Sequence, residues 1–110
     1  MDTITYDDFV KLDIRVGTIL EAESHPDADK LLILKIDEGN DEPRQLVAGI
    51  KNYYSVEELI GKQIVFLANL EPRLLRGQMS KGMILAARDE DDNLGFLTVD
   101  KKVNNNAKIS

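Results

Sequence analysis

The residues whose chemistry is most distinctive are the basic side chains between positions 73 and 88. Arg73, Arg76, Lys81 and Arg88 lie there without a single carboxylate, so the segment carries four positive charges. The whole chain of 110 residues has a formal net charge of −6, which leaves −10 on the remainder. Because the chain is acidic almost everywhere else, we predict that this segment meets a negatively charged partner.

The sequence around these side chains predicts a loop at the edge of a sheet. Pro72 and Gly77 bracket a turn, and the apolar run Met83–Ala87 is typical of a buried strand. Loops held at the rim of a rigid sheet are where binding groups usually lie. We therefore expect the basic side chains to be presented from such a rim.

The other reactive residue types form no catalytic or metal-binding pattern. His25 is the only histidine, and Pro26 and Asp27 follow it, which favours a turn over a metal site. The acids between positions 89 and 93 resemble a calcium loop, but the glycine and the last ligand are misplaced, so we expect a solvated hairpin. No glycine-rich phosphate loop is present. We predict a non-catalytic protein with no metal or cofactor.

The chain is predicted to form one soluble domain over residues 1–110. It has no cysteine, so neither a disulfide framework nor a thiolate metal site is available. Its apolar runs are shorter than the roughly 18 residues of a membrane span. Residues 1–9 contain three acids and no basic residue, unlike a signal peptide. We expect a cytoplasmic location and no membrane partner.

Hydrophobic alternation predicts several short strands. Gly17 lies where a small barrel would bend the first of them. Ser55 and Glu58 form a capping box for one helix between the third and fourth strands. Five strands with a helix in this place are the order of an OB-fold, so we predict an all-β, five-stranded Greek-key barrel with terminal extensions. The expected strands cover residues 12–23, 31–37, 44–50, 63–69 and 82–88, and a further strand covers 94–99.

Apolar residues near both ends of the chain exceed what a barrel of this size can cover. Thr5 and Asp8 form another capping box, but a single helical turn is not stable alone. We therefore expect an isologous homodimer. Among Asn104, Asn105 and Asn106, at least one is expected to adopt a left-handed conformation. The predicted dimer interface contains Ile4, Tyr6, Phe9, Val10, Phe96, Leu97 and Val99.

Four blocks of the sequence together resemble one family. They are DFVKLDIRVGTILEAESHPDADKLLILKID, RQLVAGI, YSVEELIGK and NLEPRLLRGQMSKGMILAA, in this order. The blocks are similar to the tRNA-binding domain appended to methionyl-tRNA synthetases. That domain also occurs as a free-standing dimeric tRNA-binding protein and at the end of eukaryotic synthetase-associated cytokine precursors. The resemblance covers nearly the whole chain.

The resemblance implies an OB-fold homodimer that grips the elbow of folded tRNA by shape, with little dependence on sequence. Such a module, as an appended domain or a separate subunit, would raise the tRNA affinity of a methionyl-tRNA synthetase. The family positions associated with tRNA binding correspond here to Lys30, Ser80 and Met83. Relatives often carry further lysines where this chain has Glu71 and Leu74. Because this chain lacks those lysines, we expect its basic patch to be weaker and its tRNA binding to be modest at physiological salt.

The side-chain chemistry agrees with an RNA ligand. Arg73 and Arg76 offer planar donors to phosphate oxygens, and Lys30 and Lys81 offer point charges. Folded RNA exposes its backbone and its 2′-hydroxyls, so such donors read shape. The alternative for Arg73, Arg76 and Lys81 is a solvated basic rim without a ligand.

Ser80 and Met83 each have two interpretations. The Ser80 hydroxyl can donate to phosphate or ribose, or it can satisfy a backbone amide in a turn. Met83 can pack on a ribose or a base, or it can be a strand methionine of the core.

Residues 51–54 extend the predicted groove. Lys51 and Asn52 are further candidates for tRNA binding, and the aromatic rings of Tyr53 and Tyr54 can stack on bases. The alternative for both tyrosines is packing within the chain, and we favour packing for Tyr54.

A related branch of the same fold supplies an alternative function. It is a dimeric export chaperone that holds unfolded preproteins in an apolar groove. The blocks at residues 25–31 and 72–83 resemble the tRNA-binding branch more closely. A third alternative is an assembly module that docks a synthetase or an accessory protein.

Overall fold

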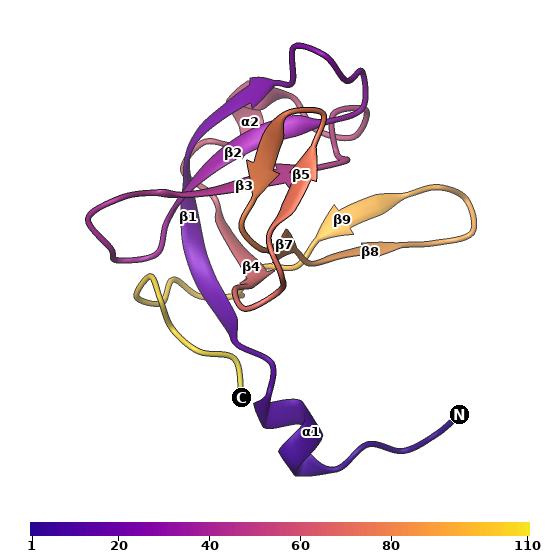
Figure 1. The fold of residues 1–110 in the computed structure, drawn as a ribbon, viewed down its shortest axis with the longest axis vertical. Coiled ribbons are helices and arrows are strands. Elements are labelled where there is room, and N and C mark those ends of the chain that lie inside the picture. Colours follow the sequence, from indigo (N-terminus) through magenta and orange to yellow (C-terminus); the bar gives the residue numbers. More distant parts are fainter.

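A nearly closed five-stranded antiparallel barrel forms the body of the molecule (Figure 1). The structure is a computed structural model that describes all residues 1–110. The barrel strands are β1 Ile14–Ser24, β2 Leu32–Asp37, β3 Arg44–Ala48, β4 Gln63–Leu67 and β7 Met83–Ile84, in the order β3-β2-β1-β4-β7. The remaining elements are helices α1 Tyr6–Val10 and α2 Val56–Leu59, and two hairpins, β5 Arg73–Leu75 with β6 Gln78–Ser80 and β8 Ala86–Arg88 with β9 Leu94–Phe96. The predicted all-β, OB-type barrel is confirmed.

Strand β1 joins both halves of the barrel because it is long enough to pair on both sides. Its first half pairs with β4 and its second half with β2. Gly17 lies next to Thr18, where the two pairings meet, and a Cβ atom at Gly17 would clash with Ile36 and Phe66. A bulge between Ile19 and Glu21 leaves Leu20 unpaired and exposed, whereas Ile19 before it is buried in the core and Ala22 after it packs against the core.

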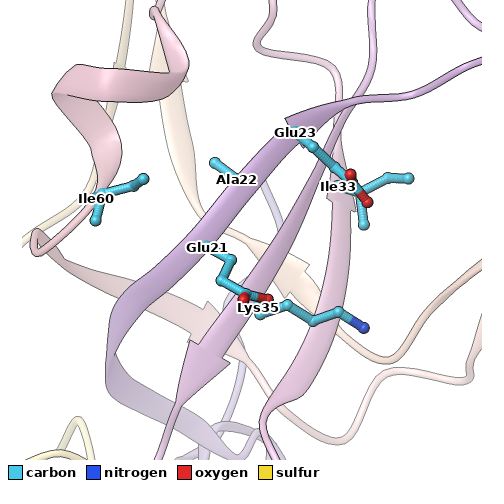
Figure 2. A pocket seen from close by; sticks show the side chains of 6 residues that line it. All are labelled: Glu21, Ala22, Glu23, Ile33, Lys35 and Ile60. Carbon is cyan, nitrogen blue, oxygen red and sulfur yellow. The ribbon is translucent and has the colours of Figure 1, made fainter.

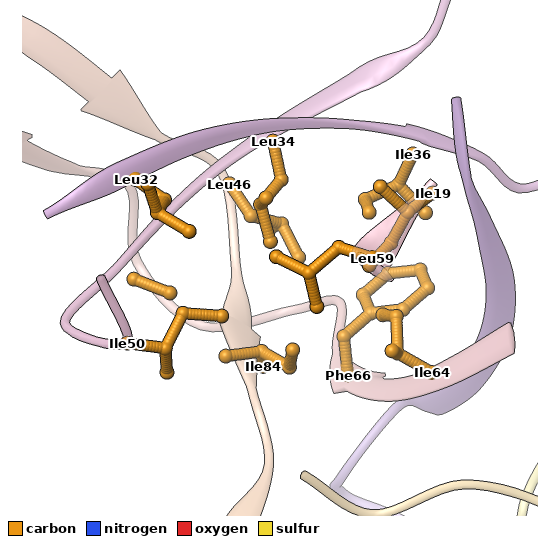
Figure 3. Packing of buried hydrophobic residues seen from close by; sticks show 11 residues of the cluster. Ile19, Leu32, Leu34, Ile36, Leu46, Ile50, Leu59, Ile64, Phe66 and Ile84 are labelled. Carbon is orange, nitrogen blue, oxygen red and sulfur yellow. The ribbon is translucent and has the colours of Figure 1, made fainter. Parts of the chain in front are cut away.

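Apolar side chains from all five barrel strands and from α2 fill the barrel interior (Figure 3). Phe66 and Leu59 have no exposed surface. Burying one such side chain contributes about 1.5–3 kcal/mol, so this cluster is the main source of stability. Its members are Ile19, Leu32, Leu34, Ile36, Leu46, Ala48, Ile50, Leu59, Ile64, Phe66 and Ile84.

Both helices begin at the capping boxes that the sequence predicts. Thr5 and Asp8 exchange side chain to backbone hydrogen bonds at α1, and Ser55 and Glu58 do so at α2. The bond from the backbone amide of the cap residue is the main reason that the pKa of each carboxylate is lowered. Leu59 anchors α2 in the core, whereas α1 projects from the barrel and has no buried residue (Figure 1).

The hairpin β5–β6 replaces the loop that the sequence predicts at this place. Its two-residue turn, Arg76 and Gly77, has φ values of 51° and 86°. Positive φ at both central residues matches the turn that suits the right-handed twist of a hairpin. The strand predicted over residues 82–88 is also divided, since β7 pairs with β4 whereas β8 pairs with β9.

The C-terminal segment lies back along the start of β1. The amide of Val16 donates to the carbonyl of Ala107 at 3.0 Å, and the amide of Asn106 donates to the carbonyl of Val16 at 2.7 Å. Asn106 has a φ of 75°, as predicted for one asparagine of this run. Neither helix has the length and apolar character needed to cross a membrane.

Candidate nucleic-acid interface

Ser80 closes the barrel between β3 and the hairpin β5–β6. Its hydroxyl accepts a hydrogen bond from the amide of Val47 at 3.0 Å and donates one to the carbonyl of Gly82 at 2.9 Å. The amide of Lys81 also donates to the carbonyl of Gln45 at 2.9 Å. Ser80 is buried with its only hydrogen donated inside the chain, and the amide that it satisfies belongs to strand β3 rather than to a turn.

Arg44 fixes the Lys81 backbone from the other side. Its guanidinium pairs with the carboxylate of Glu38, which is 5% exposed, and the Nη2–Oε1 distance is 3.0 Å. Nη1 donates to the carbonyls of Lys81 at 2.6 Å and Ala68 at 3.1 Å, and the guanidinium lies 5.5 Å from the Phe66 ring centroid. The hydrogen bond with Glu38 raises the pKa of Arg44. The pair therefore holds the Lys81 backbone while the Lys81 side chain remains exposed.

Six exposed cations lie on or next to the segments that line two depressions, and they are here called the basic face. Lys30 and Arg76 line one shallow notch, and the amide of Lys51 donates to the carbonyl of Lys30 at 3.3 Å. Leu31 lines both this notch and a neighbouring cleft, so the two depressions adjoin. The basic face consists of Lys30, Lys51, Arg73, Arg76, Lys81 and Arg88.

Most of the basic face has no ion partner within the chain. Arg88 pairs with Asp92 at 3.5 Å, and the chain's other ion pairs use Lys11, Arg15 and Arg44. Asp27 and Asp29 line the notch beside the cations, so the local charge is mixed there. Five of the six cations are nevertheless available to an anionic ligand.

His25 positions the notch by joining two segments. Its Nδ1 accepts a hydrogen bond from the amide of Asp27 at 3.0 Å, and its Nε2 lies 2.9 Å from the carbonyl oxygen of Leu75. This geometry requires the hydrogen on Nε2, which donates to Leu75. The turn role predicted for His25 is confirmed, and the buried ring brings the turn with Lys30 against the hairpin with Arg76.

An open cleft of about 510 Å³ lies between the two hairpins, beside the end of β3. Its charged lining side chains are Arg73, Arg88 and Glu71. Met83 lines it and is 45% exposed, so this side chain is not a core methionine. Much of the remaining lining is apolar and includes Val47, Leu70, Leu75, Ile84, Ala86 and Leu94.

The two tyrosines beside the cleft have different surroundings. The Tyr53 hydroxyl donates to Asp92 at 2.7 Å, which raises the pKa of Tyr53, and the Arg88 guanidinium lies 5.5 Å from its ring centroid. The Tyr54 ring packs on Phe96 at 5.0 Å, and its hydroxyl accepts from the Phe96 amide at 3.2 Å. The packing role that we favoured for Tyr54 is confirmed.

Asp89 holds the turn of hairpin β8–β9. Its carboxylate accepts hydrogen bonds from the amides of Asp91 and Asn93 and from the Asn93 side chain. The Asn93 side chain is the main cause of the lowered pKa of Asp89. The acidic turn is therefore a self-capped hairpin, as the sequence predicts.

A second open depression, here called the acidic hollow, has a volume of about 350 Å³ (Figure 2). It lies on the outside of β1 and β2, beside the end of α2. Two carboxylates share it with one ammonium, and that ammonium donates to Gln45 Oε1 at 2.6 Å. The acidic hollow is lined by Glu21, Ala22, Glu23, Ile33, Lys35 and Ile60.

The predicted tRNA-binding residues lie on or beside one surface. The residues that line the notch or the cleft are Lys30, Arg73, Arg76, Ser80 and Met83. The exposed Lys51 and Asn52 continue from Lys30, and Lys81 lies between Ser80 and Gly82 without lining the cleft itself.

The predicted dimer residues differ in how far they are exposed. Val10 and Leu97 are exposed, as are Ile4 and Tyr6, whereas Phe9, Phe96 and Val99 are half-buried in their own chain.

Sequence reasoning did not assign the pair Glu38–Arg44 or the walls of the cleft. The pair flanks a loop and is six positions apart, a spacing that has no diagnostic value by itself. Arg88 was counted only as part of the charged segment. Its place at the cleft depends on the hairpin β8–β9. The sequence did not predict this hairpin, because residues 82–88 were expected to form one continuous strand.

A small OB-type barrel with a cationic surface beside an apolar cleft is the architecture of an oligonucleotide-binding domain. Residues 14–108 match the family model described as "Putative tRNA binding domain". The chain therefore belongs to the tRNA-binding domain family.

Relatives of known sequence and structure agree with this membership. The chain is 51% identical over 109 residues to the methionine–tRNA ligase of Thermococcus kodakarensis, and the match covers 99% of this chain but 14% of that ligase. A methionyl-tRNA synthetase related protein of Pyrococcus horikoshii superimposes with a TM-score of 0.92 at 34% identity, covering 100% of both chains. The chaperone CsaA of Bacillus anthracis gives 0.88 at 33% identity, covering 99% and 100%.

Proposed function

We propose that this chain is a non-catalytic domain that binds folded tRNA by shape through the basic face. The observation that carries the proposal is the group of five unpaired cations on or next to the segments that line one notch and cleft, in a family member whose net charge is −6. An otherwise acidic chain repels polyanions from its remaining surface, which orients the RNA toward this side.

The free donors suit the RNA backbone better than base edges. Arg73 and Arg76 offer forks to phosphates, and Lys30, Lys51 and Lys81 add charge that is insensitive to base sequence. Ser80 has a supporting role in this proposal, because its hydrogen already holds the Gly82 carbonyl. Recognition then follows the spacing of phosphates and 2′-hydroxyls on a folded RNA.

The domain acts in this proposal within a methionyl-tRNA synthetase assembly in the cytoplasm. The match to the Thermococcus ligase covers 14% of that protein, so the chain corresponds to a small part of such an enzyme. Residues 1–110 would fold as one unit and raise tRNA affinity, whether joined to the catalytic chain or bound to it as a subunit.

A homodimer is part of the same proposal. Helix α1 projects from the barrel and exposes Ile4, Tyr6 and Val10, of which Tyr6 is 75% exposed. A five-residue helix needs a packing partner, and a second copy would supply one. Two basic faces on one particle would strengthen binding through multivalency. Sedimentation at micromolar concentration should give a dimer, and a monomer would contradict this part.

The salt dependence of tRNA binding tests the proposed site. Replacing Arg73, Arg76 and Lys81 together by alanine should weaken binding and flatten the slope of log K against log salt by roughly two, since each phosphate contact contributes about 0.7–0.9. The matched control replaces Lys62, Lys101 and Lys102, three exposed lysines near a separate depression. It changes the net charge equally and should leave the slope unchanged. Equal effects of both triple variants would contradict the site assignment.

Peptide binding is the second candidate function. The apolar cleft and the structural similarity to the chaperone CsaA favour it. A dimeric export chaperone would hold unfolded preproteins there, with an affinity that hardly changes with salt. Salt-independent capture of an unfolded apolar protein, without tRNA binding, would favour this alternative.

A further inference from the structure

The cleft between the hairpins has a shape and a lining that the phosphate contacts do not use. We infer that it receives one unstacked nucleobase of the bound RNA. This inference rests on the proposed function and adds a second kind of contact to it. Open, mostly apolar depressions with a few charged groups at the edge are typical of ligand sites, and 510 Å³ lies within their usual size range.

The charges around the cleft favour a nucleotide over an apolar peptide. Arg73 comes from one hairpin and Arg88 from the other, so cations lie on both sides of the opening. A base that enters the cleft leaves its flanking phosphates outside, where both guanidinium groups can reach them. Glu71 is the single carboxylate that lines the cleft. An uncharged peptide offers these arginines only neutral carbonyl oxygens, which form weaker hydrogen bonds with guanidinium groups than phosphates do.

The notch continues the same track. Leu31 separates the cleft from the notch that contains Lys30 and Arg76, so the next phosphates of the strand meet further cations. The connected arrangement is an apolar site for one base beside a cationic path for the backbone. Single-stranded nucleic acids are bound elsewhere by a basic groove together with aromatic side chains on which bases stack. In this cleft, aliphatic and methionine side chains would take the place of the aromatic ones.

The cleft should accept any base. Ser80 is its buried polar side chain, and the hydrogen of that hydroxyl is already donated to Gly82. No side-chain donor therefore remains in the floor to read a base edge, whereas every base offers the same kind of flat face. A base site of this kind is compatible with binding that does not depend on sequence.

Methyl NMR of the full chain tests this site directly. The protein would carry ¹³C-labelled leucine and methionine methyl groups, and the first probe would be a folded tRNA transcript. We expect intermolecular contacts between base protons and the methyls of Met83 and Leu94, and none at Leu20 on the bulge of β1. Bound tRNA without such contacts would overturn the base site while leaving the proposed function intact. Failure of tRNA to bind at all would contradict the proposed function itself.

An uncharged peptide rich in leucine and phenylalanine is the second probe. This peptide should not change the chemical shifts of the Met83 and Leu94 methyl groups at concentrations where tRNA changes them. Saturable shifts of these methyls with the peptide, and none with tRNA, would overturn the inference and assign the cleft to peptides.

Substitution of half-exposed wall residues provides an independent readout. Leu70 is 43% exposed and Met83 is 45% exposed, so Leu70→Ala and Met83→Ala should fold normally. Each should weaken tRNA binding about five-fold, the low end for loss of one base contact, with an unchanged salt slope because no charge is removed. The control is Leu74→Ala, because Leu74 is 63% exposed on hairpin β5–β6 but does not line the cleft. An equal loss in the control, or no loss in either wall variant, would overturn the base site.

Discussion

The cleft and the acidic hollow are open depressions of a few hundred cubic ångströms on one barrel, yet their charges differ. The charged residues of the hollow, Glu21, Glu23 and Lys35, lie on β1 and β2, whose inward side chains build the core. The arginines of the cleft lie on the two hairpins, and no member of the buried core cluster belongs to either hairpin.

This difference separates folding from binding. The cleft and the acidic hollow are similar enough in size that both could hold a small group. Charge and free hydrogen-bond donors must therefore determine which depression an anionic ligand binds. The five-stranded barrel supplies stability, and in the proposed function the hairpins attached to its edge supply the groups that contact the ligand. Hydrogen bonds made by Ser80 and Arg44 are the physical link between these two parts.

The largest effect should come from the residue where the hairpin meets the barrel. Gly82 has a φ of 137°, and an added Cβ atom would lie 2.6 Å from the carbonyl oxygen of Leu67. We expect Gly82→Ala to reduce the free energy of unfolding by about 3 kcal/mol, measured in urea. The matched control is Gly77→Ala, where φ is 86° but no atom lies within 4 Å. Its loss should be smaller, and equal losses would refute the close-contact explanation.

The second effect concerns the ion pair that holds the Lys81 backbone. Glu38→Gln should cost about 2 kcal/mol, because it leaves a partly buried guanidinium without its counter-charge. It should also weaken tRNA binding at temperatures where the variant is fully folded. Asp13→Asn removes the partner of the more exposed Arg15 and should cost less than about 1 kcal/mol, with unchanged tRNA affinity. Unchanged binding by folded Glu38→Gln would show that the pair does not position the basic face.

Acid should weaken an element beside each depression. Glu58 caps α2 near the hollow and Asp89 caps the hairpin at the cleft, and both have a lowered pKa in the folded chain. Such groups stabilise the fold above their unfolded values near 4, and this contribution is lost as pH falls through the lower folded pKa. The thermal midpoint should therefore decline below about pH 4, and less steeply in Glu58→Gln and Asp89→Asn. An equally steep decline in both variants would contradict the capping roles.

The smallest effect should follow from changing the acidic hollow. Glu21→Gln with Glu23→Gln should alter tRNA affinity less than about two-fold at physiological salt, where charges beyond about 8 Å are largely screened. A fluorescence titration of folded tRNA would measure this. A large gain in affinity would mean that RNA also passes the hollow, and the contrast between the two regions would fail.

Much of the barrel could be predicted because its physical signals are local. Alternating Ile, Leu and Val residues mark the strands, and the pairs Thr5–Asp8 and Ser55–Glu58 mark the helix starts. The hairpin β5–β6 could not be predicted in this way. Its strands have three residues each, and its turn places arginine where asparagine or glycine is usual.

The site could be predicted only in part. Charge counting indicated Arg73, Arg76 and Lys81 as candidates, because a cluster of cations in an acidic chain is visible in the sequence. The role of Ser80 was ambiguous, since its partners Val47 and Gly82 are set by barrel closure. The cleft could not be predicted from the sequence. Its walls come from two hairpins that are far from β3 along the chain, and only the fold brings them beside the end of that strand.

The most direct test of the central claim compares two RNAs of equal length, a folded tRNA and an unstructured chain, at about 50 mM and about 200 mM salt. The account predicts that the folded tRNA binds more tightly at both concentrations, and that binding weakens steeply with salt. Equal affinity for the two RNAs, or a folded tRNA that remains unbound at the lower salt, would contradict it.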